Sequence, residues 1–252
     1  MQRFFLEFIV KKNEPVIITD YNILHHARDV LKLKIKEEVV IVDKKGNEYA
    51  CFIEEISEKL VLKVKLERLS DKDVKKKMKI TVACAIPKKA KMDEIIDKLT
   101  QLGVDRIIPL ETQHVIVKLE SKKKISRQAR WEKIALSASQ QSQRNSIPQV
   151  SPICQFKEVL LEAQNYDLRL IPTLIGKRES LSDIFNKEKP KNILILIGPE
   201  GDFTEEEVKQ AKAKGCIAIS LGASVLRVDT AAIAVVSFLR LYEPRSSYEA
   251  GV

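Results

Sequence analysis

The sequence predicts an α/β protein in which a small β-rich domain precedes a larger domain built on a parallel sheet. Three observations lead to this prediction. Short runs of alternating apolar and polar residues dominate up to about residue 70. Apolar strands alternate with amphipathic helices in the rest of the chain. Between the two patterns lies the polar, lysine-rich stretch 71–77, which has no apolar period. We therefore expect domains at residues 1–72 and 73–252.

The first domain reads as a small β-barrel of short strands. Alternating or β-branched runs predict strands at residues 4–10, 15–18, 38–42, 49–53 and 59–66. Lys45-Gly46-Asn47 supplies the turn between the third and fourth of these strands. Only residues 21–33 show a helical pattern in this part of the chain.

The second domain alternates buried strands with helices. Strands are expected at residues 79–86, 104–110, 168–174, 192–197 and 217–221, and helices at 93–102, 127–142, 156–163, 205–214 and 231–241. Gly103 and Gly215 follow two of these helices, where glycine commonly ends a helix. The strand at 192–197 is apolar on both faces, which places it in the middle of a parallel sheet.

Charge and cysteine usage limit the class of protein. The 252 residues include 44 Lys and Arg against 35 Asp and Glu, a net charge of +9 that suits a polyanionic partner or, alternatively, a solvated basic surface. The four cysteines show no metal-ligand or redox spacing, so we expect core thiols in a reducing compartment and no metal site. No signal peptide and no apolar run of about 20 residues is apparent, so a cytoplasmic protein without a membrane partner is expected.

The turn after strand 192–197 is the first candidate site. Gly198-Pro199-Glu200-Gly201 follows the strand, and Thr204 with Glu207 forms a capping box for the next helix. Phe203 and Val208 occupy the positions of a hydrophobic staple. Ligands bind α/β folds at such turns, although a purely structural turn is the alternative. No phosphate-loop motif is present, and the acidic residues of this turn would repel a phosphate but tolerate a sulfonium group or a ribose.

The second candidate segment is Leu221–Arg227, which precedes the apolar helix at 231–241. An apolar helix of this kind is expected in a core or at a subunit interface. Arg227 then enters a mostly apolar neighbourhood and needs partners. Asp229 and Thr230 are candidate N-caps, and Asp229 could equally pair with Arg227. A capped helix with a local ion pair is the alternative to a ligand site.

Taken together, these residues resemble the RsmE family, SPOUT-class methyltransferases that make 3-methyluridine in small-subunit (16S) ribosomal RNA. Residues 197–202 resemble the motif I-G-P-E-G-G/D, and residues 221–231 resemble L-G-x-R-I-L-R-x-E-T-A. Further matches lie at 85–88, 91–93, 98–104, 141–145 with Pro148, and His26 with 30–32. The chain departs from the family pattern at Lys32, Gln101, His114, Gln140, Ser224 and Asp229; the changes at His114 and Ser224 remove positive groups.

The resemblance implies a SPOUT fold with a C-terminal trefoil knot, an N-terminal PUA-like barrel, a homodimer, and S-adenosylmethionine as cofactor. The residues it assigns to cofactor binding are Leu170, Pro172, Thr173, Leu174, Ile197, Gly198, Pro199, Glu200, Gly201, Leu221, Gly222, Val225 and Leu226. Backbone groups are expected to make most of the contacts with adenine. The partner it implies is small-subunit ribosomal RNA, or the assembled small subunit.

The same resemblance leads to expectations for catalysis and RNA binding. Arg227 would stabilise the anion that develops on uracil or bind the target phosphate, and Asp229 or Glu200 could orient it or accept the N3 proton. Since N3 lies on the Watson–Crick edge, the target base must be unpaired or flipped. The residues expected to contact RNA are His26, Lys32, Lys88, Lys91, Lys122, Lys123, Arg127 and Arg144.

Two other functions remain open at this point. The loss of positive groups at Ser224 and His114 would suit a non-catalytic RNA-binding ribosome-assembly factor on the same fold. A nucleotide-hydrolysing α/β enzyme is disfavoured because the phosphate-loop motif is missing.

Overall fold

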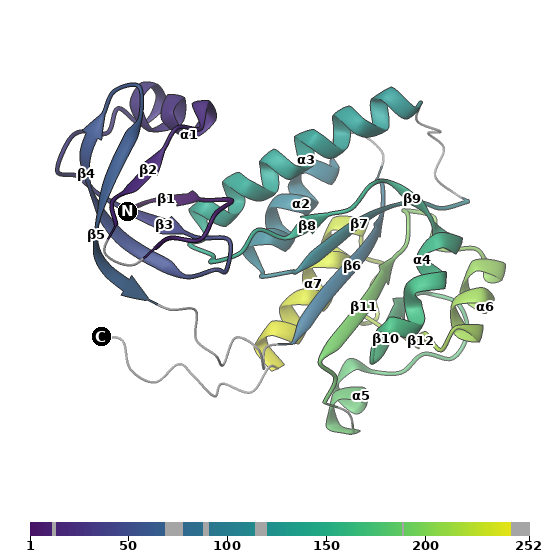
Figure 1. The fold of residues 1–252 in the computed structure, drawn as a ribbon. Coiled ribbons are helices and arrows are strands. Elements are labelled where there is room, and N and C mark those ends of the chain that lie inside the picture. Colours follow the sequence, from purple (N-terminus) through teal and green to yellow (C-terminus); the bar gives the residue numbers. More distant parts are fainter. Residues whose placement is uncertain (12–13, 69–77, 88–90, 114–119, 188, 243–252) are drawn as a thin grey trace. The chain divides into compact units, whose positions relative to one another are not determined.

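The computed structural model describes residues 1–11, 14–68, 78–87, 91–113, 120–187 and 189–242 (Figure 1). The chain divides into two compact units. Unit 1 comprises Met1–Lys75 with Ser139–Ser146, and unit 2 comprises Lys76–Ala138 with Ile147–Val252. The expected domain boundary at residue 72 lies outside the described residues and stays a prediction. That residues 139–146 belong with the first unit was not predicted.

Unit 1 is a curled five-stranded sheet in the order β1-β3-β4-β5-β2. Its strands are β1 (Gln2–Phe5), β2 (Val16–Ile18), β3 (Glu38–Val42), β4 (Glu48–Ile56) and β5 (Leu60–Arg68). β1 runs parallel to β3, and the other pairs are antiparallel. Among the described residues β1 and β2 are the two edges and do not pair, so a closed barrel stays a prediction.

The helical segment of unit 1 covers the predicted residues in two parts. Helix α1 (Tyr21–His25) is capped by Asp20, whose Oδ1 accepts a hydrogen bond from the Ile23 amide at 3.0 Å. The π-helix η1 (His26–Val30) continues it. Leu24 and Ala27 are buried against the inner face of the sheet, in a core that also holds Phe4.

A buried arginine joins residues 139–146 to the sheet of unit 1. The guanidinium of Arg3 donates to Glu48 Oε1 at 2.7 Å and to the carbonyl oxygen of Arg144 at 3.0 Å. Gln140 Nε2 donates back to the carbonyl oxygen of Arg3 at 3.0 Å. Because a buried guanidinium must be paired, these bonds determine where the segment lies within the unit.

Unit 2 is built on a parallel sheet in the order β12-β10-β11-β6-β7-β8, with β9 also paired to β7. Its strands are β6 (Lys79–Ala85), β7 (Arg106–Glu111), β8 (Gln149–Val150), β9 (Cys154–Gln155), β10 (Leu168–Pro172), β11 (Asn192–Ile197) and β12 (Ile217–Ile219). In β11, Ile193 and Ile195 belong to one hydrophobic core, whereas Leu194 and Leu196 belong to the other. The expectation of a central, doubly buried strand is therefore confirmed.

Helices cover both faces of this sheet (Figure 1). The first face packs against α2 (Lys91–Gln101), α3 (Ser121–Gln141), α5 (Leu181–Lys187) and α7 (Val228–Tyr242). The second face packs against α4 (Phe156–Glu162) and α6 (Glu205–Ala213), and the short 3₁₀-helix η3 (Ala163–Asn165) follows α4. The result is the three-layer α/β arrangement that the alternation of strands and helices predicted.

Most predicted elements are present, with shifted ends. The first strand ends at Phe5 rather than at residue 10, and α3 begins at Ser121 rather than at Arg127. Helix α5 and the strands β8 and β9 were not predicted, because two-residue strands and a seven-residue helix carry too little periodicity. Among the described residues, no helix combines the length and apolarity needed to span a bilayer.

The cysteines and the lone tryptophan lie as expected in the core. All four thiols are free, and Cys51, Cys84 and Cys216 are buried. Burial raises the pKa of the Cys51 thiol to about 12 and that of Cys216 to about 11. Trp131 is buried, and its indole nitrogen donates to Asp93 Oδ1 at 3.0 Å. These thiols are therefore protonated packing groups.

The start of α6 is held by the predicted capping box. Thr204 Oγ1 accepts from the Glu207 amide at 3.1 Å, and Glu207 Oε2 accepts from the Thr204 amide at 2.9 Å. The other oxygen of the buried Glu207 accepts from the Gln113 amide at 3.0 Å. Phe203 and Val208 are buried in one core at the expected staple positions. Glu207 thus links the end of the β7 segment to the helix that follows β11.

We predict that removing this cap destabilises unit 2. Thr204→Ala should lower the free energy of unfolding by about 1 kcal/mol, because it leaves an amide of α6 without its acceptor. Glu207→Ala should cost more, about 2 kcal/mol, since it also leaves the Gln113 amide unpaired. Urea denaturation measures both changes. The control is Glu205→Ala in the same turn; an equal loss for this exposed residue would contradict the argument.

Candidate functional site

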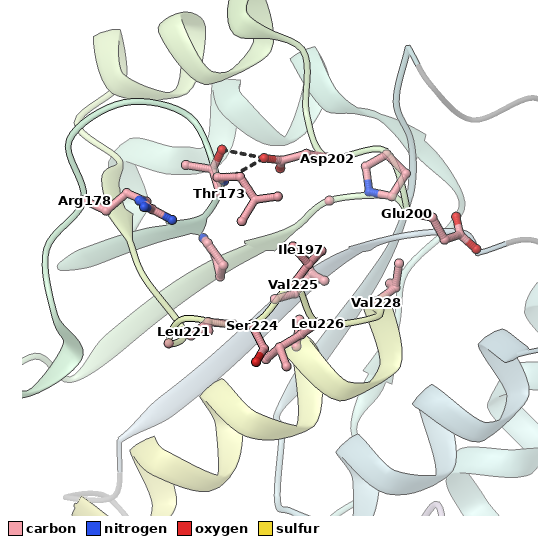
Figure 2. Close-up of a pocket in the computed structure, with 16 residues that line it drawn as sticks. Thr173, Arg178, Ile197, Glu200, Asp202, Leu221, Ser224, Val225, Leu226 and Val228 are labelled. Carbon is pink, nitrogen blue, oxygen red and sulfur yellow. Dashed lines mark hydrogen bonds between the residues drawn. The ribbon is translucent and has the colours of Figure 1, made fainter.

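A pocket of about 590 Å³, a volume that includes space open to solvent, lies at the carboxyl ends of β10, β11 and β12 (Figure 2). Because parallel strands end at the same edge of a sheet, the segments that follow them meet there. The pocket is lined by Pro172, Thr173, Leu174 and Arg178 after β10, by Ile197, Gly198, Pro199, Glu200 and Asp202 after β11, and by Leu221, Gly222, Ser224, Val225, Leu226, Val228 and Ala231 after β12. Its size suits a small organic molecule.

Asp202 joins the first two of these segments. Its Oδ2 accepts hydrogen bonds from Thr173 Oγ1 at 2.9 Å and from the Leu174 amide at 2.7 Å, as the dashed lines in Figure 2 show. Its Oδ1 accepts from the Phe203 amide at 2.8 Å. Asp202 has a φ of +61°, a left-handed conformation that aspartate tolerates better than most residues. One carboxylate therefore aligns the segments after β10 and β11.

The segment after β10 is held at its far end as well. Glu179 forms a parallel bridge with Ile219 of β12. The Glu179 amide donates to the Ala218 carbonyl at 2.9 Å, and the Ser220 amide donates to the Glu179 carbonyl at 3.0 Å. Residues 173–178 thus form a loop whose two ends are fixed, one to the turn after β11 and one to β12.

Glycines bring backbone to the pocket surface. A Cβ at Gly198 would lie 3.0 Å from the ring of Phe203, so any larger residue would require this buried ring to shift. Gly222 has a φ of +114°, and a Cβ there would meet open space. From Leu221 to Leu226, only the Gly222 amide donates a hydrogen bond to a described residue. The other amides are free to bond a ligand.

The charged groups of the lining are placed asymmetrically. Figure 2 shows Arg178 at one end of the pocket and Glu200 at the other, with Asp202 along one side. Burial, followed by the charges of Asp229 and Glu200, raises the pKa of Cys84 to about 12, which keeps this fully buried thiol protonated. Cys84 is therefore not a nucleophile for this site.

The structure brings most of the predicted cofactor residues together around this pocket. All of them line it except Leu170, which is fully buried in the core, and Gly201. Asp202 and Ser224 lie within the two segments predicted to build the pocket, although they were not assigned to cofactor binding, and prediction missed Arg178, Val228 and Ala231. Val228 and Ala231 lie within residues 221–231, which resemble the second family motif, so the motif could have indicated them. Arg178 lies in a polar loop and carries no motif.

The candidate catalytic residues are arranged differently from the prediction. Glu200 lines the pocket, whereas Arg227 is exposed and does not enter an apolar neighbourhood, because the chain turns into α7 directly after it. Its side chain makes no hydrogen bond or ion pair with a described residue. The pair of Arg227 with Asp229, which the sequence left open as an alternative, is not formed: Asp229 Oδ2 lies 3.8 Å from Lys91 Nζ. Asp229 and Thr230 do not cap α7, which begins one residue earlier, at Val228.

The residues expected to contact RNA lie in both units. In unit 2, Lys122, Lys123 and Arg127 are exposed on the first turns of α3, and Lys91 is half-buried. In unit 1, Lys32 is exposed, the half-buried His26 ring meets Phe4 edge-on at 6.3 Å, and Arg144 donates to Ser146 Oγ at 3.4 Å. Lys88 and His114 lie outside the described residues.

We predict that Asp202 controls the order of the loop after β10. Asp202→Gly removes the acceptor but suits the left-handed backbone, so amide hydrogen exchange at Leu174 should accelerate roughly tenfold or more. Asp202→Asn keeps one oxygen acceptor and should show a smaller acceleration. The Ser220 amide, which bonds Glu179, is the internal control. Unchanged exchange at Leu174 in Asp202→Gly would disprove the role of the carboxylate.

Comparisons with known proteins agree with this geometry. A family model described as an RNA methyltransferase domain matches residues 74–240, and one described as an RNA methyltransferase PUA domain matches residues 18–66. The ribosomal RNA small subunit methyltransferase E of Bacillus subtilis is 29% identical, with 94% of this chain and 95% of that protein covered. The protein of the same name from Mesomycoplasma hyopneumoniae is 33% identical, with 92% and 96% covered.

A solved structure shows a similar fold with a ligand. The ribosomal RNA small subunit methyltransferase E of Neisseria gonorrhoeae, determined bound to S-adenosylmethionine, superimposes with a TM-score of 0.81 at 28% identity. The match covers 96% of this chain and 97% of that one. The match therefore includes residues of both units.

Proposed function

The chain belongs to the family of the ribosomal RNA small subunit methyltransferase E, and on that premise we propose that it methylates N3 of a uridine in small-subunit ribosomal RNA, with S-adenosylmethionine as methyl donor. It is an S-adenosylmethionine-dependent ribosomal RNA methyltransferase. The observation that carries the proposal is the pocket, which residues 197–202 and 221–227, the two family motifs, build side by side.

The lining residues fit this cofactor. Apolar side chains of Ile197, Leu221, Val225 and Leu226 suit the adenine ring. The free amides between Leu221 and Leu226 offer hydrogen bonds to its nitrogens. The carboxylate of Glu200 suits the cationic sulfonium group. Bound in this pocket, S-adenosylmethionine supplies an electrophilic methyl group.

The residues of the chain then act on the uridine. N3 is a weak acid, so its proton must leave as the methyl group arrives, and the imide anion must be stabilised. Arg227, permanently charged and exposed directly after the pocket loop, is placed to stabilise that anion or to hold the target phosphate. Glu200 accepts the proton in this proposal, and Asp229, beside Lys91, positions the start of α7.

Contacts with RNA are proposed for both units. Unit 1 would serve as the PUA-like RNA-binding domain, consistent with the family match at residues 18–66, using His26, Lys32 and Arg144. The exposed Lys122, Lys123 and Arg127 of α3 would neutralise phosphates. The net charge of +9 supports a polyanionic substrate.

A C-terminal trefoil knot, a homodimer and a cytoplasmic location complete the proposal. The knot is supported by the path of the chain: β12 pairs outside β10, and α7 then packs back on the central strands β6 and β11. The homodimer is supported by α7, which leaves Leu241 77% exposed on the same helix face as the exposed Ala234, two turns earlier. A ribosomal RNA substrate supports the cytoplasm.

The proposed reaction can be tested on its substrate. Purified protein and S-adenosylmethionine are incubated with small subunits from a strain that lacks this gene, and the modified base is mapped by mass spectrometry. We expect 3-methyluridine at one position, and calorimetry should show saturable cofactor binding near one site per subunit. A flat titration of the folded protein would refute the proposal. Cofactor binding without 3-methyluridine would instead indicate the non-catalytic assembly factor.

We predict that Arg227 serves the RNA rather than the cofactor. Arg227→Ala should reduce kcat for methyl transfer by about a hundredfold or more, because the developing anion loses its cation. Cofactor affinity should stay within about tenfold, since Arg227 does not line the pocket. Lys191→Ala, at the opposite end of β11, is the control and should match the wild type. A larger loss of cofactor affinity would move Arg227 into direct contact with the cofactor.

We also predict that α3 contributes phosphate contacts. Replacing Lys122, Lys123 and Arg127 by Ala should reduce the slope of log affinity against log salt concentration by about two, in fluorescence-anisotropy titrations with an RNA from the small subunit. The matched control replaces the exposed Lys187, Lys189 and Lys191 and removes the same charge. Equal slopes for the two triple variants would indicate that RNA affinity depends only on the net charge of the protein and not on the position of these residues.

A further inference from the structure

Arg178 is the cation among the described lining residues of the pocket, and no family motif contains it. Its side chain points from the loop after β10 toward the pocket in Figure 2. It makes no hydrogen bond or ion pair with any described residue. A guanidinium that lines a pocket without an internal partner has all its donors available to a ligand.

The backbone that carries Arg178 is held in place. Glu179, the next residue, forms the bridge with Ile219 and exchanges backbone hydrogen bonds with Ala218 and Ser220. At the other end of the loop, Thr173 and Leu174 bond the Asp202 carboxylate. The arginine is therefore presented from a loop fixed at both ends, which lowers the entropy lost when its side chain binds.

Asp202 and Glu200, the two carboxylates that also line the pocket, form no ion pair with Arg178. Both oxygens of Asp202 already accept hydrogen bonds, from Thr173, Leu174 and Phe203. Glu200 lies at the opposite end of the pocket in Figure 2. The lining thus has a positive end, at Arg178, and a negative end, at Glu200.

We infer that Arg178 binds the carboxylate of the methionine moiety of the cofactor. This inference rests on the proposed function. The carboxylate is the one anionic group of S-adenosylmethionine, and guanidinium pairs with carboxylate through two parallel hydrogen bonds. The cationic sulfonium group, which two methylene groups separate from the carbon that carries the carboxylate, favours the Glu200 end over the Arg178 end. The separation of charge in the lining therefore orients the cofactor along the pocket.

The test compares two thioether ligands that carry no sulfonium charge, one with the amino-acid moiety and one without it. S-adenosylhomocysteine carries the carboxylate, and 5′-methylthioadenosine lacks it. Both are titrated by calorimetry into the wild type, Arg178→Ala, Arg178→Lys and the control Lys177→Ala. Lys177 is an exposed cation next to Arg178 in sequence and does not line the pocket. Thermal unfolding shows whether each variant is folded. We expect all of them to fold, because Arg178 is exposed.

We expect Arg178→Ala to weaken S-adenosylhomocysteine about tenfold, with 5′-methylthioadenosine unchanged. Arg178→Lys should be intermediate, because it keeps the charge and loses the paired geometry. Lys177→Ala should bind both ligands as the wild type does. The Arg178 variants are also assayed for RNA affinity, which should not change.

Three outcomes would overturn the inference. Equal loss for both ligands would make Arg178 a structural residue of the pocket. No loss for either ligand, with weaker RNA binding, would place Arg178 on an RNA phosphate. If the wild type itself binds neither ligand, the proposed function fails together with the inference, whereas wild-type binding with unaffected variants overturns the role of Arg178 alone.

Discussion

The carboxylate of Asp202 is the contact on which the pocket depends. It accepts hydrogen bonds from Thr173, Leu174 and Phe203, so one side chain orders both the loop after β10 and the turn after β11. An exposed loop of this length would otherwise lose its conformation to chain entropy. Because the bonds go to a charged acceptor, they are stronger than bonds to a neutral amide would be. The left-handed backbone at Asp202 is the strain that accompanies this arrangement.

The pocket recognises its ligand mainly through backbone, and its side chains contribute shape and charge. Gly198 permits close packing on Phe203, and Gly222 opens the third segment, in which the other amides from Leu221 to Leu226 have no hydrogen-bond partner among the described residues. The Ser224 side chain lines this segment and adds no charge. Arg178 and Glu200 then supply opposite charges at the two ends. A small zwitterionic cofactor with a flat base suits such a site better than a polyphosphate does, which agrees with the missing phosphate loop.

Much of the fold and part of the site could be predicted because their signals are local. The doubly apolar strand β11 and the capping box of Thr204 and Glu207 depend on residues within one or two turns of each other. The cofactor residues of the two motifs were predicted by resemblance, and most of them line one pocket. The sequence did not predict the exposure of Arg227 or the pairing of Asp229 with Lys91. Apolar neighbours in sequence do not show which way a side chain points.

The sequence by itself determined the alternation of strands and helices, the capped turn after β11, and the family to which the two motifs belong. Each of these depends on residues that are close together in sequence, because hydrophobic periodicity and turn-forming residues determine local structure. Only the tertiary structure decided that Arg3, itself paired with Glu48, holds residues 139–146 in unit 1. It likewise decided that Arg178 reaches the pocket, since that depends on Glu179 pairing with Ile219, 40 residues away in sequence. Contacts between distant segments follow from packing, which local patterns do not encode.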